Sequence, residues 1–267
     1  MPAFTTELQA ALAAVEQASK LCRTVQTTIT PEVLDKRDQS PVTIADFGSQ
    51  AVVCRCIHQA FPTDPIIAEE DSAALHWPEN AGFLAAVCDH VHQLGIEGDT
   101  SDVCGWIDRG GAMTYSHRFW TLDPIDGTKG FLRKGQYAVS LALIIDSQIE
   151  VGVLGCPNLP LSDVEGGPVG AVFYAVRGQG AFIRPLDGDG PAHSIQVSRT
   201  NHPELARFCE SVESGHSAHN ESAAVAQRLG LTATPVRMDR QAKYATVARG
   251  FADDYLKVVH KRNLGLT

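Results

Sequence analysis

The sequence lacks any long apolar run. No stretch approaches the roughly 18 residues of a membrane-spanning helix, and the opening residues Met-Pro-Ala-Phe-Thr-Thr show no basic region followed by an apolar one. We therefore expect no membrane partner, no secretory signal and a cytoplasmic location. Internal repeats and low-complexity segments are also missing. Together with 44% apolar and 20% charged residues, these absences are typical of an ordinary globular protein.

Basic residues are comparatively few. Lys and Arg total 22 against 31 Asp and Glu, so the formal net charge is −9. This balance argues against a nucleic acid polymer as partner, because the polyanion would be repelled. A small phosphorylated substrate is not excluded, but it would need a bound cation between its phosphate and the protein's acids.

The number of cysteines is odd. There are seven, mostly inside apolar segments, which predicts buried thiols in a reducing compartment rather than a disulfide framework. Cys54 and Cys56 have the wrong spacing for a zinc knuckle and would diverge on a helix. We expect no metal there.

The length of 267 residues allows one large domain or two joined subdomains. Helical spacing predicts helices from Thr5 or Thr6 to Cys22 and from Phe47 to Phe61, and turn signals predict antiparallel hairpins between 138 and 183. After Ser198, short strands and helices alternate. We therefore predict an α+β subdomain over 1–198 and an α/β subdomain over 199–267.

The rest of the chain is organised around residues 120–132. Phe119–Leu122 predicts the end of a buried strand, broken at Pro124 and followed by Gly127. Asp123 and Asp126 flank that break, and Thr128 stands where a following helix would be capped. The alternative interpretation is a polar turn in which Asp126 and Thr128 only cap the helix.

Two further acidic positions have similar settings. Asp46 lies at the predicted start of a helix. Its alternative interpretation is a capping box, for which Thr43 and Asp46 have the required spacing. Glu69 opens an acidic run, Glu69–Asp71, directly after a short apolar strand at 65–68. Solvation of that run is the alternative reading. A helix from about Phe83 to Leu94 and a Gly- and Asp-rich connection over 95–116 follow.

The joint placement of Asp46, Glu69, Asp123 and Asp126 predicts a metal site. Four carboxylates share one site only with about two divalent cations between them, and oxygen ligands favour Mg²⁺. Thr128, bonded to Asp46, could orient an attacking water. Backbone N–H groups near Gly127 and Thr128 could bind a phosphate.

These motifs carry a resemblance to a known family. Trp120-Thr-Leu-Asp-Pro-Ile-Asp-Gly-Thr128, with Ala68-Glu-Glu-Asp71 upstream, resembles the first signature of the inositol monophosphatase superfamily. Four more segments are similar to its 3′(2′),5′-bisphosphate nucleotidase branch: Lys129–Leu143, Pro41–Asp46, Gly215–His219 and Met238–Tyr244. The likeness covers about residues 5 to 258 and implies a layered α-β-α-β-α sugar-phosphatase-like fold.

The resemblance also implies residue roles. Mg²⁺, as two or more ions, would bind Glu69, Asp123, Asp126 and the carbonyl of Ile125, while Asp46 and Thr128 would activate the water. Nucleotide contacts would come from His216 and Lys243, and more loosely from Asp239 and Arg240. The implied substrates are 3′-phosphoadenosine 5′-phosphate, which would give AMP, and 3′-phosphoadenosine 5′-phosphosulfate. The resemblance also implies a role in sulfur metabolism and nucleotide salvage. It further implies that lithium inhibits the enzyme.

The residues that the resemblance assigns to the nucleotide also have alternative interpretations without a ligand. His216 could be an ordinary loop histidine and Lys243 a solvated lysine on a helix face. The family pattern has serine at Arg240 and usually arginine at Lys257.

The chain also departs from the pattern at its end. The family's second signature, Trp-Asp-His-Ala-Ala-Gly, does not follow Val258, so a metal-ligand aspartate and its helix are missing from this sequence. We therefore expect a truncated C-terminal part and a weakened second metal. Two alternatives to the nucleotidase stay open: an inositol 1,4-bisphosphate phosphatase and a catalytically impaired homologue. The oligomeric state is open as well.

Overall fold

The computed structural model describes residues 3–29, 40–162, 164, 166–188, 190–212 and 219–255. Their contacts divide the chain into two compact units, residues 1–194 and 195–267. The junction that we expected near residue 198 lies just beyond this division. Each unit is described by itself.

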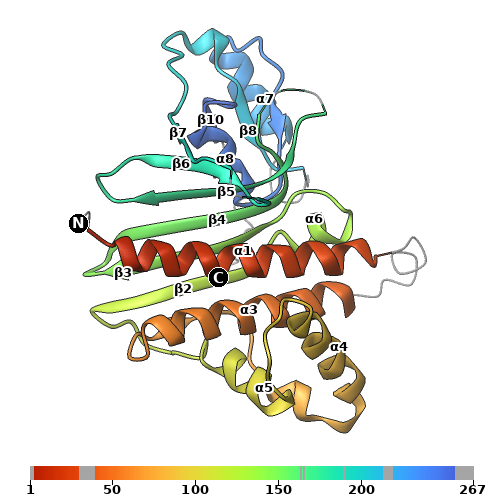
Figure 1. The fold of residues 1–267 in the computed structure, drawn as a ribbon. Coiled ribbons are helices and arrows are strands. Elements are labelled where there is room, and N and C mark those ends of the chain that lie inside the picture. The colour runs from red at the N-terminus through yellow and green to blue at the C-terminus, as the bar shows by residue number, and fades with distance from the viewer. Residues whose placement is uncertain are drawn as a thin grey trace, which may run out of the picture. The chain divides into compact units, whose positions relative to one another are not determined.

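The first unit is built on a seven-stranded sheet with the order β1-β2-β3-β4-β5-β6-β7 (Figure 1). Its strands are β1 (Ile66–Ile67), β2 (Arg118–Asp126), β3 (Ala138–Ile145), β4 (Gln148–Pro160), β5 (Val169–Val176), β6 (Ala181–Pro185) and β7 (His193–Ile195). β1 runs parallel to β2, whereas the pairs from β2 through β6 are antiparallel. The predicted hairpins are confirmed. β4 and β5 extend further into the expected loop over 159–170, and β7 was not predicted.

Helices cover the sheet in layers. α1 (Thr5–Thr27) and α3 (Ser40–Ala60) run side by side, with α1 packed on β3 and β4 and α3 packed on β2 (Figure 1). α4 (Ala81–His92) and α5 (Thr100–Asp108) pack on the other side of α3. Short elements complete the unit: η1 (Ala73–His76), η2 (Pro78–Asn80) and α6 (Thr128–Leu132).

Two apolar clusters match these layers. The larger one joins α1, α3 and the sheet, around residues such as Val15, Ile57 and Leu141. The smaller one joins α3 to α4 and α5 and includes Phe47 and Ile107. α3 therefore contributes to both clusters, and a polar side chain on it can reach either layer.

α5 corrects the expectation of an irregular connection over 95–116. Asp99 is its N-cap and forms a capping box with Asp102, each side chain accepting a hydrogen bond from the other's backbone N–H. The many Asp and Gly residues of this stretch indicated a loop, but the acids are helix-starting residues here. The helix then ends before Gly110 and Gly111, whose backbone continues alongside β1.

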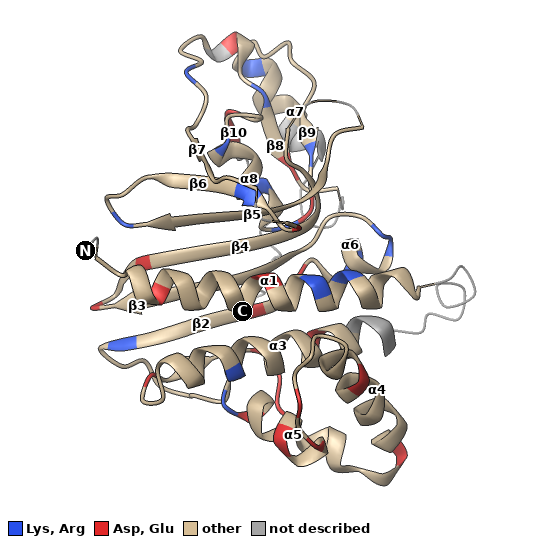
Figure 2. Ribbon diagram, in the orientation of Figure 1, with Lys and Arg blue, Asp and Glu red and all other residues tan. Residues whose placement is uncertain are grey.

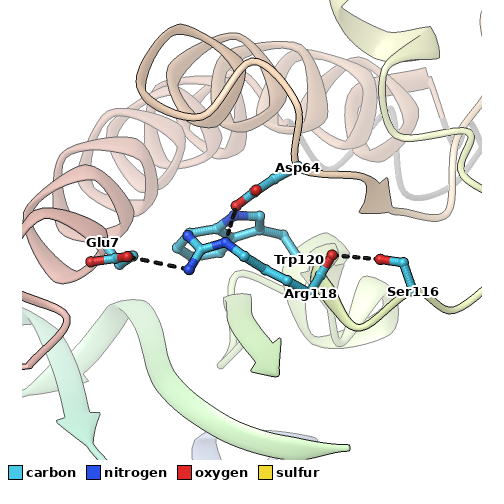
Figure 3. Close-up of polar contacts among 5 residues, drawn as sticks. All are labelled: Glu7, Asp64, Ser116, Arg118 and Trp120. Atoms are coloured by element: carbon cyan, nitrogen blue, oxygen red, sulfur yellow. Dashed lines mark hydrogen bonds and ion pairs between the residues drawn. The ribbon is translucent and has the colours of Figure 1, made fainter. Parts of the chain in front are cut away.

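A polar network fixes the start of β2 (Figure 3). Asp64 accepts hydrogen bonds from Arg118 Nε at 2.7 Å and from Trp120 Nε1 at 3.0 Å. Arg118 also reaches Glu7 of α1 at 3.3 Å and lies over the ring of Phe61. This network links α1, the segment that follows α3 and the start of β2.

The second unit is a small α/β unit. Its three parallel strands have the order β10-β8-β9, namely β10 (Asp254–Tyr255), β8 (Phe208–Glu210) and β9 (Val236–Arg237). The helices are η3 (Pro203–Leu205), α7 (His219–Arg228) and α8 (Ala242–Ala248). The alternation predicted after Ser198 is thus present. The predicted loop over 27–40 and the segment after Tyr255 fall largely outside the described residues.

The thiols behave as predicted: none of the seven cysteines, all of which lie in the described ranges, forms a disulfide, six are buried and Cys56 is half-buried. Burial raises the pKa of the Cys54 thiol to about 12, so that thiol is protonated at neutral pH. Among the described residues, no helix is both long and apolar enough to cross a bilayer.

Candidate active site

The topology brings two acid-bearing segments to the same edge of the sheet. β1 and β2 are parallel neighbours, with Ile66 opposite Trp120 and Ile67 opposite Thr121. Parallel strands end at the same edge, so the run Glu69–Asp71 after β1 lies on the side where β2 carries Asp123 and Asp126. Figure 2 shows the acidic positions at this end of β2, away from its basic start.

β2 does not break at Pro124, contrary to our expectation. It continues to Asp126, with an irregularity in its pairing with β3. Asp123 pairs with Ser140 and Asp126 with Ala138, so three steps on β2 match two on β3. This extra residue is a β-bulge, which accommodates a proline that has no N–H to donate. Because Ser140 and Ala138 share a face of β3, the bulge also places Asp123 and Asp126 on one face.

The turn after β2 depends on Gly127. α6 begins at Thr128, and Gly127 occupies the N-cap position with a φ of 108°. Such a positive φ is readily adopted only by glycine. Thr128 is therefore the first helical residue, which corrects the expectation that it caps the helix. Its side chain is exposed.

Asp46 is not part of a capping box, so the alternative interpretation of this residue is wrong. α3 already begins at Ser40, so Thr43 and Asp46 both lie within the helix. Asp46 shares a helix face with Ser49 and Gln50, three and four residues on. Ser49 Oγ donates to the carbonyl of Pro124 at 3.0 Å, at the bulge of β2. This contact brings the Asp46 face of α3 to the acid-bearing end of β2.

The acids influence one another electrostatically. Burial raises the pKa of the Asp46 carboxyl to about 9, and the negative charges of Glu70, Glu69 and Asp123 add to this effect. Burial and the charges of Glu69 and Asp71 also raise the pKa of Glu70. Such mutual repulsion arises only when carboxylates are close together, and a cation between them would relieve it.

The donor set fits a hard cation. Carboxylates and a backbone carbonyl supply only oxygen ligands, and the excess of negative charge matches Mg²⁺. Over the described ranges, no three His, Cys, Asp or Glu side chains converge closely enough to complete a ligand set. The set of Glu69, Asp123, Asp126 and the Ile125 carbonyl therefore stays a prediction.

The nucleotide-side residues lie in the second unit. Lys243 in α8 is only 3% exposed and donates from Nζ to Ser211 Oγ at 2.8 Å, so the alternative of a solvated lysine is wrong. Asp239 is 7% exposed. Arg240 is exposed, with a φ of 43°. This left-handed backbone is uncommon for a residue other than glycine. His216 lies outside the described residues.

Sequence reasoning missed Gln50, which links α3 to the acidic run. Its Nε2 donates to the carbonyl of Glu70 at 2.6 Å, and its Oε1 accepts from the N–H of Glu70 at 2.9 Å. The only signal in the sequence was its position one helical turn after Asp46.

Comparison with known proteins decides the family. The sequence model of the Inositol monophosphatase family matches residues 3–261. The chain belongs to the inositol monophosphatase family.

Relatives within this family carry a more specific name. A protein of Emericella nidulans called 3′(2′),5′-bisphosphate nucleotidase is 40% identical, over 94% of this chain and 78% of its own length. One of Schizosaccharomyces pombe with the same name is 41% identical, over 97% and 78%. The resemblance predicted from the motifs, to the family and to its nucleotidase branch, is confirmed.

Solved structures of the family confirm the fold class. An inositol monophosphatase from Zymomonas mobilis matches with a TM-score of 0.59 at 18% identity, over 94% of this chain and 76% of its own. The inositol monophosphatase family member CysQ from Bacteroides thetaiotaomicron matches with a TM-score of 0.56 at 18% identity, over 96% and 80%. The layered α/β architecture that we predicted from the resemblance is thereby confirmed.

Proposed function

We propose that the chain is a Mg²⁺-dependent 3′(2′),5′-bisphosphate nucleotidase. It would remove the 3′-phosphate of 3′-phosphoadenosine 5′-phosphate, which gives AMP. It would also remove the 3′-phosphate of 3′-phosphoadenosine 5′-phosphosulfate. These reactions belong to sulfur assimilation and nucleotide salvage. The observation that carries this proposal is about 40% identity to nucleotidases over most of the chain. The grouping of Asp46, Glu69, Glu70 and Asp123 in one electrostatic environment supports a metal-assisted reaction.

In this proposal, Glu69, Asp123, Asp126 and the carbonyl of Ile125 hold the Mg²⁺ ions. Bound Mg²⁺ supplies Lewis-acid polarisation of the phosphoryl group and favours ionisation of a water. The parallel ends of β1 and β2 and the bulge at Pro124 bring these acids to one edge.

Asp46 and Thr128 orient the attacking water. Asp46 accepts its proton, which requires the ionised carboxylate. Burial and neighbouring acids oppose that ionisation, and positive charge at the site favours it. The backbone N–H groups at Gly127 and Thr128 would bind the phosphate, because the glycine turn leaves the start of α6 without a side-chain cap.

The second unit would contact the nucleoside part of the substrate. Lys243 is held by its bond to Ser211, so its charge has a defined position within α8. His216, Asp239 and Arg240 are the further contacts in this proposal. Arg240 presents its side chain to solvent, where it can meet a second phosphate.

The test is phosphate release from 3′-phosphoadenosine 5′-phosphate by the full chain with Mg²⁺, with and without lithium. Asp123→Asn should lower kcat/KM by about 100-fold or more, because a ligand carboxylate is lost. Asp146→Asn is the matched control: Asp146 is an exposed acid paired with His117 in the β3–β4 turn, and this variant should retain wild-type activity.

Inositol 1,4-bisphosphate is the competing substrate in the same assay. A preference for the nucleotide of about 1,000-fold, or roughly 4 kcal/mol, would exclude an inositol phosphatase. Equal kcat/KM values would exclude the nucleotidase. A folded chain that releases phosphate from neither substrate would contradict the proposal and support the impaired homologue.

A further inference from the structure

The acid-bearing loop Glu69–Ser72 is held by two side chains that the family motifs do not include. We propose that Gln50 of α3 and Asp108 of α5 are positioning residues that fix this loop for metal binding. The inference rests on the proposed Mg²⁺-dependent function. It adds α5, through Asp108, as a support of the site.

The side-chain amide of Gln50 makes three hydrogen bonds to the backbone. It pairs with the peptide of Glu70 in both directions, at 2.6 Å and 2.9 Å, and its Nε2 also donates to the carbonyl of Ile107 at 2.9 Å. The side chain is 0% exposed. A buried amide with all these bonds satisfied has one orientation, so the backbone of Glu70 is fixed between α3 and the end of α5.

Asp108 holds the other end of the loop. Its Oδ1 accepts from the N–H of Ser72 and its Oδ2 from Ser72 Oγ, both at 2.8 Å. Ser72 is 1% exposed. Asp71, between the two held residues, accepts from the N–H of Ala73 at 2.9 Å, so its carboxylate is engaged within the loop. The backbone on both sides of Asp71 is thereby fixed.

The chain leaves little space for this arrangement to change. A Cβ on Gly110 would lie 2.7 Å from Gln50 Nε2 and 2.7 Å from the Cβ of Ala68. The N–H of Ala68 also donates to the carbonyl of Gly110 at 2.8 Å. The acid-bearing loop, Gln50 and the end of α5 are therefore packed as one set, and the position of Glu69 follows from it.

The experiment compares two single substitutions in α5 of the full chain. Asp108→Ala removes both bonds to Ser72, and because Asp108 is exposed the variant should fold. Asp102→Ala breaks the capping box at the opposite end of α5 and does not touch the loop. The measurements are direct Mg²⁺ binding by calorimetry, thermal unfolding without metal, and kcat and KM for 3′-phosphoadenosine 5′-phosphate.

We expect Asp108→Ala to raise the Kd for Mg²⁺ by about tenfold or more, the usual effect of losing a group that orients a metal ligand. Asp102→Ala should lower the thermal stability by a similar amount but leave the Kd for Mg²⁺ unchanged. Asp108→Asn retains an acceptor for the N–H of Ser72 and should recover most of the affinity. Gln50→Glu, which keeps one acceptor but loses two donors, should weaken Mg²⁺ binding as Asp108→Ala does.

Equal Mg²⁺ affinity in Asp108→Ala and Asp102→Ala would overturn the inference, and so would a wild-type chain that binds no Mg²⁺ at millimolar concentration. A wild-type chain that binds Mg²⁺ but releases no phosphate would contradict the proposed nucleotidase alone. In that case, a weakened Kd in Asp108→Ala would still support the positioning role.

Discussion

Asp46 shows how the setting of one residue determines its chemistry. It lies in the second turn of α3 rather than at the helix start, and its neighbours are other acids and the buried thiol of Cys22. Its raised pKa means that the protonated form is favoured without a cation. A divalent ion would reverse this preference. In the proposed function, Asp46 would thus couple metal binding to its own ionisation.

The first prediction follows from that pKa. The folded state holds a proton on Asp46 that the unfolded chain releases above its ordinary value of 3.8, so stability falls as the pH rises from there towards about 9. For one group the slope is at most roughly 1.4 kcal/mol per pH unit. Thermal unfolding in EDTA between pH 5 and 8 should show this decline, and Mg²⁺ should reduce it.

Asp46→Asn tests the assignment. The neutral amide should flatten the decline and stabilise the metal-free chain at pH 8, while abolishing turnover because no carboxylate accepts the proton of the water. An unchanged slope in this variant would assign the titration to another group, such as Glu70.

The second prediction concerns the close approach at Gly110. Gly110→Ala should destabilise the chain by about 1–3 kcal/mol, because the new methyl group overlaps with Gln50 and Ala68. It should also weaken Mg²⁺ binding. Gly105→Ala in α5 is the control: its Cβ would meet nothing within 4 Å, so the helix should gain about 0.5–1 kcal/mol. Chemical denaturation measures both, and similar stability changes in the two variants would contradict the packing argument.

At the scale of elements, the two ends of β2 carry different groups of side chains. Its start carries the network of Arg118, Trp120 and Asp64, shown in Figure 3, and its end carries Asp123 and Asp126. At about 3.3 Å per residue, the ends of this strand are roughly 25 Å apart. The network supports the packing of the strand, and the bulge at the other end aligns the acids.

The third prediction uses this separation. Asp64→Ala should destabilise the chain by about 1–3 kcal/mol, because Trp120 Nε1 and Arg118 lose their shared acceptor in a buried setting. The Kd for Mg²⁺ should not change. Thermal unfolding and calorimetry provide the two readouts, and a clear loss of Mg²⁺ affinity would show that the two ends of β2 are coupled.

Element boundaries were predicted well where one local rule decided them. The helical spacing of 5–22 and the turn signals between the hairpin strands gave the correct types. α5 was missed because Asp99 and Asp102 have the composition of a loop, although their side chains close a capping box. The end of β2 was wrong because a bulge admits Pro124 within a strand, and a bulge depends on the partner strand.

At the scale of the whole molecule, net charge decides how a phosphorylated ligand can approach. The chain carries −9, and the acids of the candidate site add local repulsion. An anionic substrate would therefore need a bound cation as well, and we expect the two ligands to bind cooperatively.

The fourth prediction is a strict dependence of substrate binding on metal. Titration of 3′-phosphoadenosine 5′-phosphate into the chain in EDTA should show a Kd at least about tenfold weaker than with Ca²⁺ or Mg²⁺, a coupling of roughly 1.4 kcal/mol. Metal and nucleotide together should raise the unfolding temperature more than the sum of their separate shifts. Equal affinity with and without metal would contradict the electrostatic argument.

The sequence by itself determined the family, because a signature of nine residues around Asp123 and Asp126 fixes residue types whose chemistry is specific. It also determined which acids were candidates, since each follows a recognisable strand or helix boundary. Only the tertiary structure decided how those acids are placed. The parallel pairing of β1 with β2, the bulge at Pro124 and the bonds of Gln50 and Asp108 join residues far apart in the chain. No local pattern encodes such contacts, because their energy comes from packing and hydrogen bonding between elements.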